Sequence, residues 1–449
     1  METDHGQSEK IIIQNTTFYD PNSKQLIEGN MVVENGIIIA LGDPIANFDS
    51  TGAVVINGKD LTCVPGFIDL HAHLREPGFE YKETIETGTS AAVKGGFTTV
   101  CAMPNTSPAI DNEATVNFVK EKARTTGKCR VYPIGAVTKN REGQSIVDFM
   151  ELYEAGVVGF SDDGDPVSDA EVMRLALLYV SGLDVPIMNH CQDLTLSKNG
   201  VMADGDISEL LGLPGIPNAA EEVMVSRDIS LASSTNSKLH ICHVSSAGSV
   251  EMIRLAKKRG VKVTAEVCPH HLIITDESVS TGTGNGENYE YDTNSKVYPP
   301  LRTMTDISAL VEGLIDGTID CIATDHAPHD VVSKVTTFED ASFGISVFET
   351  AFGSLMELVN KEIVTFSCLI EALTIGPAKV LGDEYIKYAT LEVGTPADIA
   401  ILDLNQKWIV DVEKFVSKGK NTPLNGRVFT GKVVATIVDG YLMFDELKH

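Results

Sequence analysis

Three kinds of segment are missing from this sequence of 449 residues. No run approaches the roughly 20 apolar residues of a membrane span, and residues 1–10 lack the apolar stretch of a signal peptide. No Lys/Arg-rich stretch occurs, and 35 basic against 63 acidic residues make a net charge of −28, which disfavours binding to nucleic acid or to an anionic membrane. No CxxC pair occurs among the eight cysteines, which indicates buried reduced thiols. These absences predict a cytoplasmic protein whose partner is a small molecule.

The two ends of the sequence share one pattern, and the middle has another. Residues 10–61 and 397–444 alternate short β-rich runs with Gly and Asn turns, which predicts one β domain built from both ends. Between them, an apolar strand, a loop and a helix recur eight times. We therefore predict an α/β protein with a (β/α)8 TIM barrel at residues 65–382 and a small β-sandwich-like domain from residues 1–64 and 383–449. A doubly wound sheet is the alternative, but the chemically active side chains follow many different strands, as in a barrel.

Details of the helices and loops can also be predicted. In SAGSVEMIRLAKKRG, Ser249 is a candidate helix cap, and Val250, Ile253 and Ala256 share one face. Two stretches interrupt the repeating pattern, at residues 277–294 and 330–341. We expect both to be mobile loops over the mouth of the barrel.

A pair of histidines ends the first predicted barrel strand, CVPGFIDLHAHL. His71 and His73 are two residues apart, so on a strand they project from the same face and can hold one zinc ion. The pair alone is weak evidence, because two polar residues at a strand end are equally compatible with a structural role. Further residues of ligand type follow four other predicted strands: Asp163, His190, His243 and Asp325.

Each of these four residues, taken singly, could be a hydrogen-bonded polar group or a helix cap. Together with the first pair, they make four imidazoles and two carboxylates on one face, which suits two metals with a bridging carboxylate or one metal with spare ligands. Spacing leaves Asp162 as an alternative to Asp163. His240 and His326 should point to the opposite face. The remaining pair, His270 and His271, could line the site or pack in the core.

The sequence resembles the dihydroorotase branch of the amidohydrolase superfamily. The motifs that carry the resemblance are, in chain order, PGFIDLHAHLREPG, MPNT, FSDDG, NHCQD, CHVSS, CPHHL, PPLR and TDHAPH, with SKGKNTPLNG and GKVVATIVDGYLMF near the C-terminus. The resemblance implies an enzyme with one or two zinc ions per subunit. It assigns His71, His73 and Asp325 to the first metal, His190 and His243 to the second, and Asp163 to the bridge between them. Asp325 would also act as general base and then general acid.

Members of this family interconvert N-carbamoyl-L-aspartate and L-dihydroorotate in pyrimidine synthesis. The resemblance places Arg75, Asn105 and His329 around the substrate, and a guanidinium at Arg75 suits a carboxylate. Tyr298 stands where the family usually has Asn, and Val347 replaces a glycine, both at positions where the family holds the pyrimidine ring.

Two other classes of function compete with this prediction. One is a related cyclic amidohydrolase that acts on hydantoin, dihydropyrimidine or allantoin. The other is a non-catalytic homologue that serves as a scaffold for aspartate transcarbamoylase. The retention of all six ligand types favours an enzyme. We also expect a homodimer, from the prevalence of that state among soluble oligomers, and association with aspartate transcarbamoylase.

Overall fold

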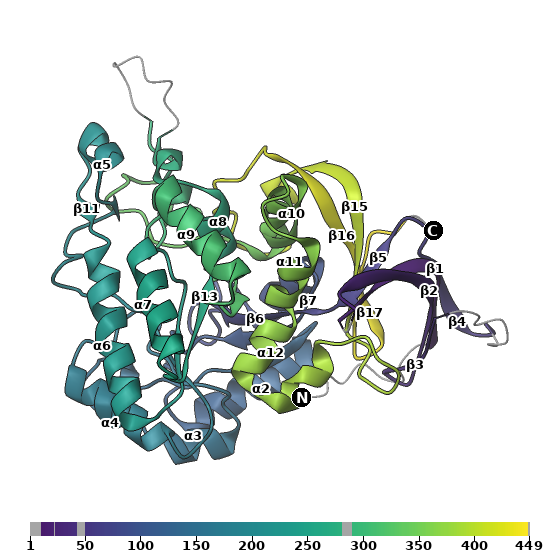
Figure 1. The fold of residues 1–449 in the computed structure, drawn as a ribbon, viewed down its shortest axis with the longest axis horizontal. Coiled ribbons are helices and arrows are strands. Elements are labelled where there is room, and N and C mark those ends of the chain that lie inside the picture. The colour runs from purple at the N-terminus through teal and green to yellow at the C-terminus, as the bar shows by residue number, and fades with distance from the viewer. Residues whose placement is uncertain (1–9, 22, 43–49, 281–289, 448–449) are drawn as a thin grey trace.

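The computed structural model describes residues 10–21, 23–42, 50–280 and 290–447, and it has the mixed α/β composition that the sequence predicts (Figure 1). Strands from both ends of the chain form one sheet, in the order β17-β16-β15-β5-β1-β2-β3, with β4 paired to β1. In Figure 1 the purple strands of the N-terminal end lie beside the yellow strands of the C-terminal end. The eight strands are β1 (Lys10–Asp20), β2 (Gln25–Glu34), β3 (Ile37–Gly42), β4 (Ala53–Asn57), β5 (Thr62–Pro65), β15 (Ile399–Ile409), β16 (Val428–Val438) and β17 (Tyr441–Asp445).

This composite sheet joins the ends of the chain through the antiparallel pairing of β5 with β15, where Cys63 lies opposite Ile401. Its buried face includes Ile11 and Ile13 from the N-terminal end and Ile437 from the C-terminal end. The contribution of both ends is therefore as predicted. Hydrogen bonds connect the eight described strands into one sheet.

Parallel strands fill the middle of the chain in two groups. One group has the order β6-β7-β8 and the other has the order β14-β13-β12-β9. Their bounds are β6 (Phe67–Ala72), β7 (Phe97–Ala102), β8 (Arg130–Pro133), β9 (Ile187–Asn189), β12 (Leu239–Ile241), β13 (Val263–Val267) and β14 (Cys321–Ile322). Single parallel bridges connect Ala72 with His326, and Phe160 with both Gly135 and Ile187. The two groups thus have a bridged contact at each edge.

The fourth predicted strand, GVVGFSDDG, is reduced to a bridge at Phe160. Its neighbour Asp162 supplies the reason, because the carboxylate of Asp162 accepts hydrogen bonds from the backbone N–H groups of Val137 and Thr138, at 2.8 and 3.0 Å. These N–H groups are consequently satisfied by a side chain and not by a strand partner.

Helices separate the parallel strands and lie on their outer side (Figure 1). The longer ones are α1 (Ile85–Lys94), α2 (Glu113–Thr126), α3 (Phe149–Ala155), α4 (Ala170–Val180), α6 (Ala219–Thr235), α7 (Ala247–Lys258), α9 (Met304–Ile315), α10 (Phe348–Asn360), α11 (Phe366–Leu373) and α12 (Ile375–Leu381). Shorter elements are α5 (Asp206–Leu211), α8 (Pro269–Ile273), β10 (Met202–Ala203), β11 (Gly215–Ile216), η1 (Lys139–Arg141), η2 (Asp276–Val279), η3 (Thr293–Ser295), η4 (Asp383–Tyr388) and η5 (Val412–Lys414). Within the described ranges, no helix has the length and apolar character needed to cross a membrane.

The start of α7 differs from the prediction by one turn. Its cap is Ser246, whose hydroxyl accepts from the backbone N–H of Ser249, so the predicted cap lies inside the helix. The predicted apolar face is correct, because Val250, Ile253 and Ala256 are all buried.

The two predicted loop segments have different outcomes. In the first segment, residues 277–279 belong to η2 and residues 293–294 to η3. Residues 281–289 lie outside the described part of the chain. Residues 330–341 form neither helix nor strand, as expected. They are tied down by Lys334, whose ammonium donates to the carbonyl oxygens of Thr293, Lys296 and Ser342 at 3.0, 3.1 and 2.7 Å.

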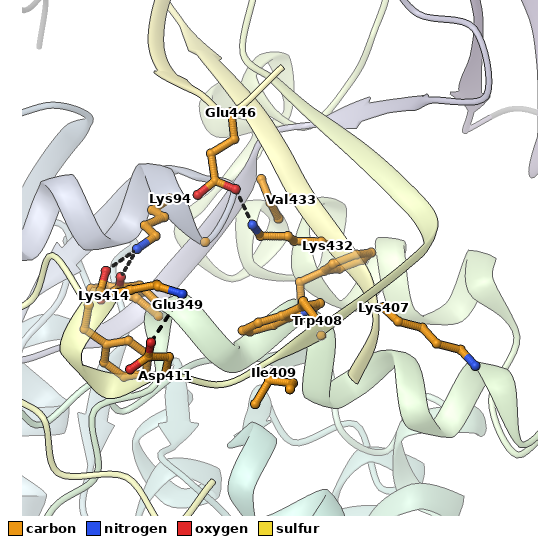
Figure 2. A pocket seen from close by; sticks show the side chains of 15 residues that line it. Lys94, Glu349, Lys407, Trp408, Ile409, Asp411, Lys414, Lys432, Val433 and Glu446 are labelled. Carbon is orange, nitrogen blue, oxygen red and sulfur yellow. Dashed lines mark hydrogen bonds and ion pairs between the residues drawn. The ribbon is translucent and has the colours of Figure 1, made fainter. Parts of the chain in front are cut away.

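A groove marks the contact of the composite sheet with α1 and α10 (Figure 2). Trp408 of β15 lines it and donates from its indole nitrogen to the Gly431 carbonyl at 2.9 Å. Three ion pairs also line the groove: Lys94 with Glu349 at 2.8 Å, Lys414 with Asp411 at 3.3 Å, and Lys432 with Glu446 (Figure 2). None of the described residues lining the groove is a predicted metal ligand. The groove therefore belongs to the contact between sheet and helices and not to the predicted site.

Candidate active site

The six predicted metal ligands meet in one buried cluster. Each is at most 4% exposed to solvent. They come from the ends of five strand segments: His71 and His73 from β6 and the residue beyond it, Asp163 after the Phe160 bridge, His190 after β9, His243 after β12 and Asp325 after β14. The carboxyl ends of parallel strands thus bring together side chains that are up to 254 positions apart in sequence, from His71 to Asp325.

Asp163 lies between two pairs of histidines. Its Oδ2 is 3.2 Å from His71 Nε2 and 3.4 Å from His73 Nε2. Its Oδ1 is 3.2 Å from His243 Nε2 and 3.5 Å from His190 Nδ1. Each oxygen of this carboxylate therefore faces a different pair of histidines.

The neighbouring Asp162 has a different role. Its carboxylate accepts from two backbone N–H groups and from the hydroxyl of Thr138, and so it is occupied within the fold. The geometry therefore distinguishes the two aspartates: Asp163 contacts the histidines, and Asp162 contacts the backbone.

The ring protons of His71 and His73 lie on Nδ1, which leaves Nε2 of each ring directed at the cluster and able to contact a cation. His73 Nδ1 donates to the Asn105 amide oxygen at 2.8 Å, so its neutral ring presents the lone pair of Nε2 to Asp325 Oδ1 at 3.0 Å. His71 Nδ1 donates to the Glu266 carboxylate at 2.7 Å, and within the described structure His71 Nε2 is buried without a hydrogen-bond partner. A lone pair that faces a carboxylate is repulsive unless a proton or a metal ion lies between them.

The electrostatics of the cluster lead to the same conclusion. Burial opposes a charge on His71, but Asp163 and Glu266 outweigh burial and raise the pKa of His71 well above its ordinary value. The site therefore attracts positive charge. The donor atoms of two groups, His71–His73–Asp163 and Asp163–His190–His243, all lie within 4.8 Å of one another in each group, so both groups could hold a metal ion.

Glu266 is a residue that the sequence analysis missed. It is fully buried on β13, contacts His71 as described, and accepts from His240 Nε2 at 3.0 Å. Burial opposes its ionisation, but His71 and His240 lower the pKa of Glu266 to about 2. A signal was present, because this residue is the single carboxylate inside the apolar run VKVTAEVC. A carboxylate behind a histidine fixes the tautomer of the ring and makes it a stronger ligand.

The other histidines have the following positions. His240 contacts Thr264 and Glu266, at 2.8 and 3.0 Å, and the backbone N–H of Val347 donates to His326 Nδ1 at 3.0 Å. Both are used within the fold, as predicted. In α8, the ring of His271 donates to the Pro299 carbonyl at 3.0 Å. Within the described part of the chain, neither ring nitrogen of its neighbour His270 has a hydrogen-bond partner.

Arg75 and His329 lie side by side next to the cluster. Arg75 is 9% exposed, and its Nε donates to the Pro328 carbonyl at 3.3 Å. No ion pair involving Arg75 occurs among the described residues, although burial lowers its pKa only to about 10 and the group remains charged. Arg75 is therefore a buried cation and not part of a surface ion pair. The Nη2 atom lies 3.4 Å from His329 Nε2.

Asn105 and Tyr298 contact the histidines of the cluster. Asn105 holds His73, as described above. The Tyr298 ring stacks on His190 with centroids 5.1 Å apart, and its hydroxyl donates to Ser197 Oγ at 3.1 Å. Both residues thus lie against histidines of the cluster, and each forms a hydrogen bond with another side chain.

Comparison with known proteins places this cluster in a family. A family model described as Dihydro-orotase-like matches residues 61–249. A dihydroorotase from Caldanaerobacter subterraneus subsp. tengcongensis is 48% identical over 422 residues, which is 94% of each chain. A dihydroorotase from Aquifex aeolicus is 45% identical and covers 97% of this chain and 100% of its own length. The chain belongs to the dihydroorotase family. The resemblance predicted from the motifs is confirmed, and with it the prediction of an enzyme.

Solved structures share the fold at lower identity. L-hydantoinase (dihydropyrimidinase) from Arthrobacter aurescens superposes with a TM-score of 0.83 at 23% identity, covering 98% of this chain and 97% of its own. Dihydropyrimidinase from Brevibacillus agri has a TM-score of 0.82 at 22% identity, covering 97% and 95%. At such identities the likeness concerns the fold alone.

Proposed function

We propose that this chain interconverts N-carbamoyl-L-aspartate and L-dihydroorotate with zinc bound at the histidine–aspartate cluster. The observation that carries the proposal is the position of Asp163, with one carboxylate oxygen toward each histidine pair. Family membership supports the reaction, since the relatives that cover nearly the whole chain are dihydroorotases.

The donors fit zinc. Imidazole nitrogen and carboxylate oxygen are zinc ligands in hydrolytic sites, and His71 Nε2 and His190 Nδ1 both face the Asp163 carboxylate, at 3.2 and 3.5 Å. We assign His71, His73 and Asp325 to one ion, His190 and His243 to a second, and Asp163 to both. When bound, such an ion supplies Lewis acidity, which activates water near neutral pH and polarises an amide carbonyl.

Asp325 is proposed to move the proton. Burial opposes its charge, but His73 and His71 hold the pKa of Asp325 below its usual range, so the group is an ionised carboxylate with oxygen lone pairs that can accept a proton. In ring opening, the same proton would pass to the ring nitrogen as the C–N bond breaks; ring closure reverses these transfers.

Four residues are proposed to hold the substrate. Arg75 is a buried cation without an ion-pair partner in the described structure, so it can pair with the carboxylate of either substrate. His329 Nε2 lies 2.8 Å from the Phe343 carbonyl, which can only accept, so Nε2 carries the proton and Nδ1 is left as an acceptor for a ring N–H. Asn105 and Tyr298 would complete the wall beside the histidines.

We infer that the eight parallel segments form one closed (β/α)8 barrel at residues 65–382. The bridges from Ala72 to His326 and through Phe160 support closure at both edges. The composite sheet would then be a second domain, made of residues 1–64 and 383–449. Zinc identity, a homodimer, association with aspartate transcarbamoylase and a cytoplasmic location are further parts of the proposal.

The substrate can be tested directly against the alternatives. Tyr298, in the position where the family usually has Asn, favours a second candidate function, hydrolysis of hydantoin, dihydrouracil or allantoin. The metal-loaded protein should be assayed in parallel on these three compounds and on L-dihydroorotate. Turnover of dihydroorotate alone is expected; turnover of another compound without dihydroorotate would replace the proposal.

Exchange of Asp325 for Asn tests the proton transfer. Asp325→Asn keeps an oxygen ligand but removes the base, so kcat should fall by about 100-fold or more while the metal content changes little. Metal content by elemental analysis and kcat on dihydroorotate are measured together. A metal-replete variant with wild-type kcat would contradict the proposed role.

A further inference from the structure

A C-terminal segment passes beneath the predicted substrate residues. Residues 417–422 follow the composite sheet's strand β15 in sequence, yet Ser417 and Asn421 are only 1% and 3% exposed. The approach is close at Gly419, where a Cβ atom would lie 2.4 Å from Ser346 Oγ and 2.5 Å from Pro328 Cβ. The motif SKGKNTPLNG therefore lies directly against the loop that follows β14.

Asn421 uses its whole side-chain amide in this contact. Its Oδ1 accepts from the backbone N–H of His329 at 2.9 Å and from Ser346 Oγ at 3.0 Å. Its Nδ2 donates to the carbonyls of Ala327 and Gly344, at 3.0 and 2.9 Å. One side chain thus joins two separate loop segments, 327–329 and 344–346. Its own backbone carbonyl adds a fifth bond, accepting from Ser346 N at 2.8 Å.

The first of these segments carries His329. Asn421 holds the backbone of His329, and the Phe343 carbonyl, one residue before Gly344, holds its ring through Nε2. Both anchors depend on the two loop segments staying together. With both in place, His329 Nδ1 remains buried without a hydrogen-bond partner in the described structure, as expected of a group reserved for a ligand.

The same segment also connects to Arg75, whose Nε donates to the Pro328 carbonyl. Pro328 lies between Ala327 and His329, whose backbone groups form hydrogen bonds with the Asn421 side chain. A shift of this segment would consequently move the guanidinium as well as the imidazole. The predicted metal ligand Asp325 depends less on Asn421. It precedes the two residues that Asn421 contacts, and His73 contacts its carboxylate.

We propose that Asn421 is a positioning residue for substrate recognition, which sets His329 by clamping the loop after β14 to the loop before α10. The inference rests on the proposed function, because it takes His329 to be a substrate contact. It explains why a motif in the C-terminal tail accompanies the catalytic motifs of the chain. The effect should fall on substrate binding, with little effect on metal binding.

A double-mutant cycle tests this role. Asn421→Ala should raise the KM for L-dihydroorotate about tenfold. A misplaced His329 would lose about one hydrogen bond to the substrate, and that loss corresponds to a tenfold change in affinity. The kcat and the metal content should change less than about threefold. In an Asn421→Ala/His329→Ala double variant, the Asn421 change should raise the KM by clearly less than the tenfold it causes alone, because its effect through His329 is already lost and only the effect through Arg75 remains.

A conservative variant and a control variant complete the test. Asn421→Asp has the same size, so it preserves packing, but it loses the donors to Ala327 and Gly344 and should raise KM as well. Asn425→Ala is the matched control, since Asn425 lies in the same tail, is exposed and accepts a hydrogen bond from Val412 N, which is far from the loop after β14 in sequence. Its KM should equal that of the wild type.

The outcomes separate the inference from the proposed function. If the wild-type enzyme fails to turn over dihydroorotate, the proposed function fails. If the wild type is active, an unchanged KM in folded Asn421→Ala and Asn421→Asp would overturn the positioning role. A KM increase that multiplies in full with that of His329→Ala would overturn it too, since Asn421 would then act independently of His329.

Discussion

At the scale of single residues, the cluster depends on side chains and backbone conformations that lie just outside it. Glu266 and Asn105 each fix one histidine of the first pair by accepting from its Nδ1. Three predicted functional residues have a left-handed backbone, with φ of 63° at Arg75, 33° at His243 and 46° at Asp325. Such conformations are unfavourable for residues other than glycine and persist where the surrounding structure enforces them, which is common at active sites.

Exchange of Glu266 for Gln should weaken metal binding. A glutamine keeps the shape but lowers the basicity of His71 and leaves His240 without a charged partner, so metal affinity is expected to fall about 10- to 100-fold. Competition with a chelator, followed by elemental analysis, measures the loss.

The control for this variant is Glu312→Gln on α9, an exposed site. It should retain metal like the wild type. Unchanged metal affinity in a folded Glu266→Gln protein would show that the carboxylate does not support His71 as a ligand.

At the scale of elements, loops after the strands are fixed by helices. Glu221 of α6 accepts from the backbone N–H groups of Ser245 and Ser246 at 3.2 and 3.1 Å, two and three residues after His243. Arg302 adds a hydrogen bond to Ser245 Oγ at 3.1 Å. The motifs CHVSS and PPLR therefore meet at one buried carboxylate, and this contact sets the end of β12 against α6.

This contact gives a prediction for pH dependence. Burial opposes the charge of Glu221, but Arg302 and the serines outweigh burial and lower its pKa. A carboxyl group with a lowered pKa in the folded state stabilises the protein above its unfolded pKa of about 4.3, and this stabilisation is lost as pH falls through the folded pKa. Glu221→Gln should therefore cost about 2 kcal/mol at pH 7 and progressively less below about pH 4.

Urea unfolding of wild type and variant at a series of pH values measures the difference. Glu251→Gln, in an exposed pair with Arg254, is the control and should change stability by less than about 0.5 kcal/mol. A Glu221→Gln difference that stays constant from pH 7 to pH 3 would argue against a stabilising charge at this site.

At the scale of the whole molecule, one arginine joins the parallel strands to the composite sheet. Arg130 of β8 is 2% exposed and forms ion pairs with Asp398 and Asp439, which flank β15 and β16. Its guanidinium also lies 4.3 Å from the centre of the Tyr388 ring. A planar group with several donors can satisfy two carboxylates and a ring at once.

Replacement of Arg130 by Lys should loosen this junction. A lysine presents one ammonium and cannot make both ion pairs, so about 3 kcal/mol of unfolding free energy should be lost. Thermal unfolding with the metal-loaded protein measures the change. Arg124→Lys, at an exposed pair with Glu121, should leave Tm within about a degree, and an equal Tm for Arg130→Lys would rule out the junction's importance.

Much of the architecture and of the cluster follows from the order of residues alone. Apolar runs that end in His or Asp predict parallel strands with their polar ends at one face, because strand periodicity and burial are local properties of the chain. On this basis the convergence of the histidines and aspartates and a β domain built from both ends could be predicted, whereas the family and the choice of Asp163 over Asp162 came from the resemblance of the motifs.

Contacts between distant residues could not be predicted in this way. Asp162 and Asp163 differ only in which of them meets the backbone of another strand, and Glu266 and Asn421 act on residues 195 and 92 positions away. The loss of the fourth strand and the cap of α7 likewise depend on hydrogen bonds that form only in three dimensions. Periodicity describes which face a side chain occupies, whereas the choice among several available partners on that face follows from the packing of the whole chain.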